Sequence, residues 1–244
     1  MNKSILILKN VPRENPGLIG ILLKEHNLEY QIIDFGSTTV IDNIENYSAL
    51  IVLGGPDSAN DLTPKMQNEL KLIRNAVRLK IPYLGICLGL QTLVKAMGGF
   101  VEKCQTSEIG FRDPKNELFK IKLTEDGRRD GLFKNLPDNL NVFQLHGETI
   151  HLTPQMTLLA TGDFCQNQIV KIGKTAYGIQ SHFELTSDLL ESWIIEDVDL
   201  QKLSPGQLRS DFEKIKTEYQ NTGRQLFINF LTMFGLMNTS NNWH

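Results

Sequence analysis

The chain of 244 residues has little cysteine, with one residue each at positions 87, 104 and 165. No two of them form a CxxC pair, and an odd number of cysteines cannot all pair with one another. Small secreted domains, by contrast, depend on dense disulfide frameworks. The scarcity of cysteine therefore favours free thiols in a reducing compartment, and we expect a cytoplasmic protein.

An excess of one charge and a long hydrophobic run are also missing. The formal net charge is -3 and no stretch is locally basic, so the composition gives no reason to expect a nucleic-acid-binding surface. The start of the chain has only a short apolar stretch before Lys9 and Pro12, which is too short for a signal peptide or a membrane span. We therefore expect neither nucleic acid nor a membrane among the partners.

Up to about residue 100, short β-rich apolar runs alternate with amphipathic helical stretches. The expected strands cover residues 4–8, 29–34, 49–53 and 81–86, and the expected helices cover 16–26, 63–79 and 90–97. The longest helix has Thr63 as its N-cap and Pro64 at its first position. Strands and helices in alternation form right-handed βαβ units, which predicts an α/β fold with an open, mainly parallel sheet flanked by helices.

After residue 100 the pattern changes to short strands joined by turns, at 118–123, 141–145, 157–160, 168–172 and 175–180. These strands either extend the sheet in antiparallel fashion or form a small second sheet. After Glu184 the sequence is helical to Met237, with a break at Pro205-Gly206, and the tail is expected to fray. We expect a main domain over residues 1–195 and a C-terminal helical extension over 196–244. Six apolar residues are expected to pack this extension onto the main domain: Leu208, Phe212, Ile215, Leu226, Phe230 and Met233.

The strongest local motif is Gly85-Ile86-Cys87-Leu88-Gly89, between an expected strand and an expected helix. A nucleophile with glycines two residues before and after it is typical of a nucleophile elbow. Side chains at the flanking positions of so sharp a turn would collide with neighbouring strands. The turn lifts the Cys87 thiol above the carboxyl edge of the sheet and places it at a helix N-terminus, where the partial positive charge favours a thiolate.

A reactive thiolate needs a base, and the base needs an orienting group. His182 and Glu184 end an expected strand far downstream, and residues at i and i+2 of an extended chain point to the same side. The carboxylate of Glu184 can therefore fix the imidazole of His182. His146, in the stretch QLHGE, is a rival base with a similar neighbourhood, ranked second as a wall of the substrate pocket.

The tetrahedral intermediate of an amide hydrolysis also needs backbone N–H donors. One candidate is the amide of Leu88, directly after the nucleophile. The other is the amide of Gly55, which follows an expected strand at the same sheet edge and has no side chain to obstruct it. Pro56 has no N–H and stiffens this turn.

Together these residues resemble the class I glutamine amidotransferase family, and most closely its free-standing members related to the glutaminase domain of GMP synthase. The resemblance covers roughly residues 48–190, where six motifs follow the family's order: LGGPDSAND, IPYLGICLGLQTL, EIGF, VFQLHGET, CQNQ and AYGIQSHFE. It implies a flavodoxin-like open sheet. It also implies chemistry that requires no metal and no organic cofactor.

By position, the resemblance makes Cys87 the nucleophile, His182 the base and acid, and Glu184 its orienting group, with oxyanion donors at Gly55 and Leu88. The implied reaction transfers the γ-glutamyl group of glutamine to the Cys87 thiol, releases ammonia, and hydrolyses the thioester to glutamate.

The resemblance also assigns substrate binding. Gln91, one helical turn past the cysteine, would hold the substrate glutamine, and the backbone around His146 and Gly147 would bind its amino-acid end. One position departs from the family, because the usual His-Pro-Glu here contains Phe183 in place of proline. We expect this change to alter loop stiffness or a partner contact.

Several functions fit these residues. The chain after Glu184 is too short for an ATP-pyrophosphatase domain and has no Gly-rich phosphate loop, so ammonia passes to a separate synthetase subunit or is released freely. The same triad could serve a γ-glutamyl peptidase. A non-catalytic regulatory or binding protein could keep the fold, although an intact triad argues against it. An intracellular-protease-like fold also uses an elbow cysteine but lacks the paired Gln91 and His-x-Glu arrangement.

Overall fold

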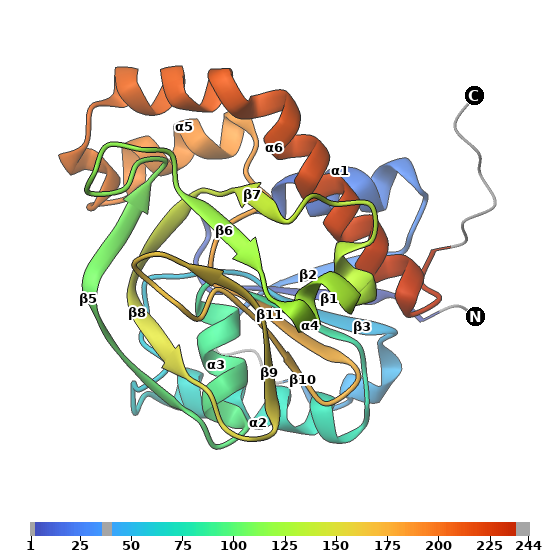
Figure 1. Cartoon of the computed structure of the whole chain (residues 1–244). Helices are drawn as coiled ribbons and strands as arrows, with labels where there is room; N and C mark the ends of the chain where they lie inside the picture. The colour runs from blue at the N-terminus through green and yellow to red at the C-terminus, as the bar shows by residue number, and fades with distance from the viewer. Residues whose placement is uncertain (1–2, 36–40, 238–244) are drawn as a thin grey trace.

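The computed structural model describes residues 3–35 and 41–237, and within them the main sheet has nine strands. Their order across the sheet is β2-β1-β3-β4-β11-β10-β9-β6-β7 (Figure 1). The first five of these strands run parallel to one another: β1 (Ile5–Lys9), β2 (Tyr30–Asp34), β3 (Ala49–Val52), β4 (Tyr83–Ile86) and β11 (Ala176–Ile179). The prediction of an open, mainly parallel sheet in the first half of the chain is therefore confirmed.

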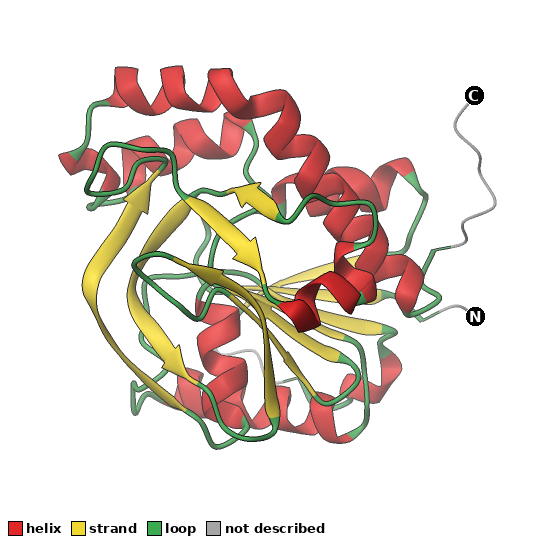
Figure 2. Ribbon diagram, viewed as in Figure 1, coloured by secondary structure: helices red, strands yellow, loops and turns green. Residues whose placement is uncertain are grey.

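Helices cover both faces of this parallel region (Figure 2). Alternate residues of β1 explain the two layers, because Ile5 and Ile7 belong to one hydrophobic cluster and Leu6 and Leu8 to another. The first cluster is covered by α1 (Gly17–Glu25) and by the C-terminal half of α6 (Pro205–Met233). The second is covered by α2 (Pro64–Arg78) and α3 (Leu88–Ala96).

The predicted start of α2 is confirmed in detail. The Thr63 side chain accepts a hydrogen bond from the Met66 amide at 3.2 Å, and Pro64 occupies the first turn. This cap satisfies one of the backbone donors that a helix start leaves without an intrahelical partner.

The middle of the chain forms both arrangements that the sequence left open, except that the strand expected at 175–180 is a parallel strand of the main sheet, β11, paired with β4. Antiparallel strands extend the main sheet: β6 (Lys120–Leu123), β7 (Asn139–Asn141), β9 (Met156–Gly162) and β10 (Ile169–Ile172). A separate antiparallel ribbon pairs β5 (Phe100–Gly110) with β8 (Gln144–His151), and the two curved strands lie side by side in Figure 1.

The predicted strand at 141–145 is wrong. Its residues are divided between β7 and β8, because the chain crosses here from the main sheet to the ribbon. The two residues between the strands, Val142 and Phe143, are both buried, and a buried apolar run does not reveal such a crossing. The long strand β5 was not anticipated either, because its mostly exposed residues do not alternate regularly.

The C-terminal part is helical, with α5 (Ser187–Glu196) followed by α6. The Pro205-Gly206 pair starts α6 after a Ser204 cap, so it separates two helices as expected. Leu208 and Phe212 pack against α5, and Leu226 and Phe230 pack on the main sheet. Met233 departs from the predicted buried face at 38% exposure. The domain boundary between residues 195 and 196 stays a prediction, and the tail beyond Met237 lies outside the described residues.

Shorter helical turns complete the elements. They are α4 (Glu125–Arg129) and the 3-10 turns Ile44–Asn46, Gly131–Phe133 and Leu200–Lys202. Within residues 3–35 and 41–237, none of the helices combines the length and the apolar character that crossing a membrane requires.

Candidate active site

Cys87 stands in the sharp turn between β4 and α3 with a positive φ of 52°. A non-glycine residue in this region is uncommon and indicates a backbone held in place by its surroundings. A Cβ atom on Gly89 would lie 2.3 Å from the carbonyl oxygen of Val52 in β3, as the predicted collision with a neighbouring strand requires. Position 85 requires glycine for a different reason. A Cβ atom added there would lie 2.3 Å from the carbonyl oxygen of Gly89 in the first turn of α3.

The Cys87 side chain is 6% exposed and faces two polar groups. Its Sγ lies 3.6 Å from the carbonyl oxygen of Leu145 in β8 and 3.7 Å from Nε2 of Gln180. The Cys87 amide donates to the carbonyl of Ile179 at 2.7 Å, which ties the turn to the end of β11. The thiol therefore sits where the main sheet meets the ribbon.

His182 and Glu184 form a buried pair just beyond β11. His182 Nδ1 lies 2.6 Å from Glu184 Oε1, and both side chains are at most 3% exposed. The backbone of His182 is fixed as well, because its amide donates to the Phe143 carbonyl at 2.9 Å and its carbonyl accepts from the Tyr219 hydroxyl of α6 at 2.5 Å. The imidazole therefore has a defined orientation, with Nε2 turned away from Glu184.

The imidazole of His182 lies beside the nucleophile turn. A Cβ atom on Gly54 would be 3.3 Å from His182 Cε1 and 3.6 Å from Cys87 Cβ, so both side chains converge on this one glycine. Burial by itself lowers the pKa of His182, but the charge of Glu184 and the nearby Cys87 raise it well above 6.5. This arrangement favours a protonated imidazole beside the Cys87 sulfur.

The contacts of Phe183 show what this residue does in place of the proline of the family's His-Pro-Glu. Its amide donates to Glu184 Oε2 at 3.0 Å, a hydrogen bond that proline cannot make. Its ring is 1% exposed and stacks on Tyr219 at 6.4 Å between centroids. Phe183 therefore packs inside the protein under α6, and the expected change in loop stiffness or in a partner contact stays a prediction.

The two predicted oxyanion donors lie at the same edge of the sheet. A Cβ atom on Gly55 would be 3.2 Å from Leu88 Cδ2 and 2.7 Å from Cβ of Asn10. Only glycine fits at position 55, and its loop packs against the start of α3. The Leu88 amide belongs to the first turn of that helix, where N–H groups have no intrahelical acceptor.

Gln91 lies on α3 with its side chain buried. Its Nε2 donates to the Glu148 carbonyl at 3.2 Å and to Gln180 Oε1 at 3.3 Å. Gln180 in turn reaches the Cys87 sulfur, so a chain of amide side chains connects the ribbon with the nucleophile. Sequence reasoning missed Gln180, although its place two residues before His182 puts both side chains on the same side of an extended segment.

His146 and Gly147 lie on β8, next to the carbonyls that face Cys87 and Gln91. The His146 imidazole takes part in another pair, because its Nε2 lies 2.9 Å from Glu108 Oε2. Gly147 is exposed, and a Cβ atom there would be 3.3 Å from Ser107 Oγ. The structure thus brings the backbone of this segment to the site, while the rival base His146 is paired with Glu108.

Glu14 is a second functional candidate that the sequence did not reveal. Its side chain is buried before α1, close enough to His182 and Glu184 for their charges to act on it. Burial raises the pKa of Glu14 from 4.5 to about 7, with the charge of His182 opposing the shift. No local pattern marks such a residue, because its surroundings come from distant segments.

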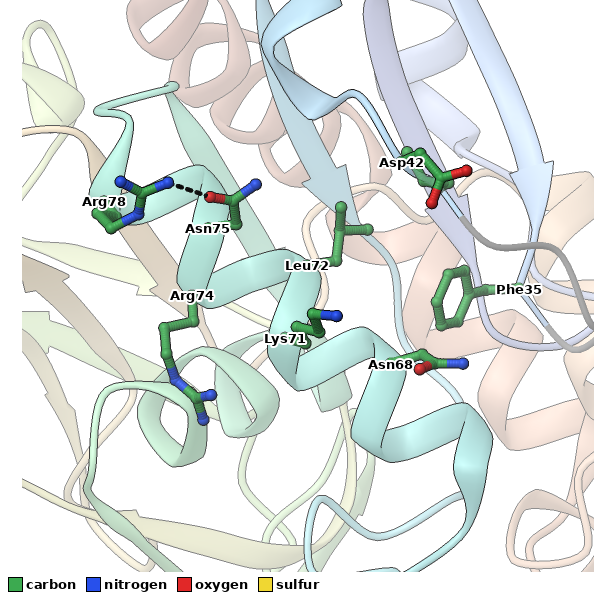
Figure 3. A pocket seen from close by; sticks show the side chains of 9 residues that line it. Phe35, Asp42, Asn68, Lys71, Leu72, Arg74, Asn75 and Arg78 are labelled. Atoms are coloured by element: carbon green, nitrogen blue, oxygen red, sulfur yellow. Dashed lines mark hydrogen bonds between the residues drawn. The ribbon is translucent and has the colours of Figure 1, made fainter.

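A pocket with a volume of about 410 Å³ lies away from the predicted catalytic residues (Figure 3). Lys71, Arg74 and Arg78 of α2 line it together with Phe35 and Asp42. The predicted catalytic residues are not among its lining residues. One group of metal-type ligands in the described chain also lies outside the predicted triad, and it consists of Cys104, His146 and Cys165.

Comparisons with known proteins show to which family the chain is related. The glutamine amidotransferase class-I family model matches residues 21–199. The glutamine amidotransferase-like protein YfeJ of Salmonella typhimurium is 32% identical over 202 residues, which cover 78% of this chain and 81% of that protein. A glutamine amidotransferase from Thermotoga maritima of known crystal structure superposes with a TM-score of 0.82 at 27% identity, covering 95% of this chain and 99% of the other.

GMP synthases are relatives too. One of the subunits of the glutamine-hydrolysing GMP synthase of Methanocaldococcus jannaschii is 32% identical over 61% of this chain and 72% of its own length. The GMP synthase of Bacillus subtilis is 31% identical over 61% of this chain, but the match spans only 28% of that longer protein. The length of the family match and the identity to YfeJ establish the relationship: the chain belongs to the class I glutamine amidotransferases.

Proposed function

We propose that the protein hydrolyses the side-chain amide of glutamine through a γ-glutamyl thioester on Cys87. The observation that carries the proposal is the convergence of three elements: a thiol on a strand–helix turn, an imidazole beside it, and a carboxylate 2.6 Å from the far nitrogen of that imidazole. A nucleophile, a base and an orienting group in this order are the requirements of covalent amide hydrolysis. Membership in the family supports glutamine as the substrate.

The first half of the reaction forms the thioester. The Cys87 thiolate attacks the side-chain carbonyl carbon of glutamine, and the amides of Gly55 and Leu88 stabilise the negative oxygen that results. His182 gives its proton to the nitrogen as the C–N bond breaks, and ammonia leaves. The γ-glutamyl group remains on sulfur, and His182 is neutral.

The second half returns the enzyme to its starting state. Neutral His182 takes a proton from a water molecule, whose oxygen attacks the thioester carbonyl. The C–S bond breaks, glutamate is released, and the thiolate–imidazolium pair is restored. Glu184 stays ionised throughout and stabilises the charged form of the ring.

Substrate binding is assigned to Gln91 and to the backbone around His146 and Gly147. The carbonyl oxygens of Leu145 and Glu148 face Cys87 and Gln91, so they are suitable acceptors for the α-ammonium group of glutamine. Gln180 completes this wall, because its amide reaches the sulfur.

The ammonia released from glutamine can leave the active site in two ways. It passes to a separate synthetase subunit, or the protein releases glutamate and ammonia freely. Similarity to a protein named as one of the subunits of a GMP synthase favours a separate partner chain. The three cysteines are free thiols, which is consistent with a cytoplasmic location.

Glutamate formation by the purified chain tests the proposal. Free glutamine and a γ-glutamyl dipeptide should be compared as substrates for wild type and Cys87→Ala, with thermal unfolding to show that the variant folds. We expect hydrolysis of glutamine that Cys87→Ala abolishes. Unchanged turnover in Cys87→Ala would refute the assignment, and hydrolysis of the dipeptide alone would identify a γ-glutamyl peptidase instead.

A further inference from the structure

A second group of reactive side chains lies around β8, and the proposed reaction does not use it. Cys104 comes from β5, His146 from β8, and Cys165 from the turn between β9 and β10 (Figure 1). One ligand atom from each of the three, two sulfurs and a ring nitrogen, lie within 4.8 Å of one another. Three separate segments therefore place two thiols and an imidazole together.

The imidazole of this group has a fixed orientation. His146 Nε2 lies 2.9 Å from Glu108 Oε2, and the same carboxylate accepts from Gln168 Nε2 at 2.8 Å and from the Cys165 amide at 3.3 Å. The imidazole and the carboxylate are at most 2% exposed. Because a carboxylate only accepts hydrogen bonds, this network places the proton of the ring on Nε2.

The other nitrogen of the ring then faces the thiols. His146 Nδ1 lies 3.7 Å from Cys104 Sγ and 3.0 Å from the carbonyl oxygen of Glu148. A bare nitrogen lone pair opposite a carbonyl oxygen is unfavourable, so a proton or a metal cation belongs on Nδ1. An imidazole whose second N–H is bound by a carboxylate is the usual form of a metal-ligating histidine.

We propose that Cys104, His146 and Cys165 bind one divalent cation of zinc type, with Glu108 orienting the histidine. Two thiolates and an imidazole are a ligand set that selects zinc over calcium or magnesium. Tetrahedral zinc with ordinary bond lengths separates its ligands by about 3.6 Å for sulfur and nitrogen and about 3.8 Å for two sulfurs. The 3.7 Å between Cys104 Sγ and His146 Nδ1 matches the first value.

Binding at this site is an exchange of protons for metal. Each cysteine loses its thiol proton to solvent as its sulfur bonds to the cation, the cation takes the place of the proton on Nδ1 of His146, and no electron is transferred. Cys104 is only half-buried, so the cation can enter from its side and complete its coordination with water. Cys165 is buried and has a further contact, with Thr149 Oγ1 at 3.2 Å from its sulfur.

A cation here would join the ribbon to the main sheet next to the active site. The residues on either side of His146 along β8 supply the Leu145 and Glu148 carbonyls that face Cys87 and Gln91. A bound cation would therefore hold the segment to which substrate binding is assigned. Its existence does not depend on glutamine hydrolysis.

A disulfide between Cys104 and Cys165 is the competing use of the same thiols. Both are free in the structure. A disulfide would have no need for the oriented His146 or for the network around Glu108, whereas a metal site uses both. The geometry therefore favours the cation.

The test measures metal in a Cys87→Ala background, so that neither turnover nor the proposed nucleophile contributes. The reduced full-length chain is stripped with a chelator and titrated with Zn²⁺ and separately with Co²⁺. We expect one equivalent per chain by elemental analysis after gel filtration, and thiolate-to-cobalt charge-transfer absorption. Adding Cys104→Ser should weaken the affinity by more than about a hundredfold, since a ligand is lost rather than an outer partner.

A matched control is His151→Ala, an exposed histidine of the same strand, which should leave the affinity unchanged. Cys165→Ser supplies a second ligand variant, and thermal unfolding reports whether each variant folds. Three outcomes would overturn the proposal: no metal bound by the reduced protein, equal affinity in folded Cys104→Ser, or equal affinity in folded Cys165→Ser. Peptide mapping of the reduced and oxidised protein then shows whether a Cys104–Cys165 disulfide forms instead.

Discussion

Two buried imidazole–carboxylate pairs lie in different parts of the molecule and face different sulfurs. At the end of the parallel sheet, His182 uses Nδ1 to bind Glu184 at 2.6 Å. In the ribbon, His146 uses Nε2 to bind Glu108 at 2.9 Å. The two pairs are similarly buried. Among the residues that the structure describes, Glu184 leaves Nε2 of His182 without a carboxylate partner, whereas Glu108 leaves Nδ1 of His146 without one.

The backbone decides what each pair can do. His182 lies beside a single thiol on a turn with positive φ, where two glycines allow the close approach of neighbouring backbone. His146 lies in an extended strand near one thiol from β5 and another from a turn. One pair is thus suited to activating a nucleophile and the other to binding a cation, although their side-chain chemistry is the same.

Replacing the histidine of the first pair should have the largest effect. His182→Ala removes the group that transfers protons in both halves of the proposed reaction, so we expect glutamate formation to fall by about 10³–10⁴-fold. Initial rates at saturating glutamine measure this. His151→Ala is the control, because His151 is an exposed histidine far along β8. If the folded His182→Ala protein kept near-normal turnover, the His182–Glu184 pair would have no part in the reaction.

Neutralising Glu184 should have the next largest effect. Glu184→Gln keeps the shape of the side chain but removes the charge that raises the pKa of His182, so we expect a rate loss of about 10²-fold. Because the imidazolium then loses its proton at lower pH, the alkaline limb of the kcat/KM profile should move to lower pH. A loss of rate with an unmoved alkaline limb would indicate a purely structural role.

Glu108→Gln is the corresponding change in the second pair. We expect it to weaken metal binding by about 10–100-fold, because an outer carboxylate that orients a ligating histidine contributes this much. Competition with a chromophoric chelator in the Cys87→Ala background measures it, and Glu184→Gln in that background should bind metal normally. If Glu108→Gln and Glu184→Gln bound metal with equal affinity, Glu108 could not be said to support the metal site more than Glu184 does, and the proposed difference between the two pairs would be wrong.

Glu69 is a buried carboxyl group that, unlike Glu108 and Glu184, is not paired with a histidine of the described chain. Burial raises the pKa of Glu69 from 4.5 to about 7, against the opposing effects of Thr92 and Lys65. The unfolded chain releases this proton near pH 4.5 and the folded protein retains it to about pH 7, so the free energy of unfolding falls as pH rises between these values.

Glu69→Gln has no such proton to lose. Its stability relative to wild type should therefore rise with pH over the same window and be largest above pH 7. The pKa difference corresponds to about 3 kcal/mol, and we expect about 1–2 kcal/mol because the buried amide also needs hydrogen-bond partners. Urea unfolding at pH 5 and pH 8 measures it, and a stability difference that does not change between these pH values would contradict the assignment.

Local patterns predicted four of the five parallel strands and the first pair, but not that β11 would join β4 in parallel. The motif around Cys87 lies within five residues, and His182 and Glu184 are two residues apart, so their geometry follows from one turn and one extended segment. These are the distances over which helical and strand periodicity act.

The second pair could not be predicted in this way. Glu108 and His146 meet only because β5 pairs with β8, with a register irregularity between Lys103 and Glu108, and Cys165 arrives from a third segment. Glu14 was missed for the same reason, since its burial and its charged neighbours depend on tertiary packing. The crossing at Val142 and Phe143 also depends on which sheet each neighbour joins.

Of the three free thiols, Cys87 is the one that we propose attacks glutamine. Mass spectrometry of peptides after reaction with a glutamine-analogue electrophile, with and without excess glutamine, tests it most directly. We expect an adduct on Cys87 that forms more slowly when glutamine is present, with Cys104 and Cys165 unmodified. An adduct on Cys104 or Cys165 with Cys87 bare, or labelling of Cys87 that glutamine does not slow, would contradict it.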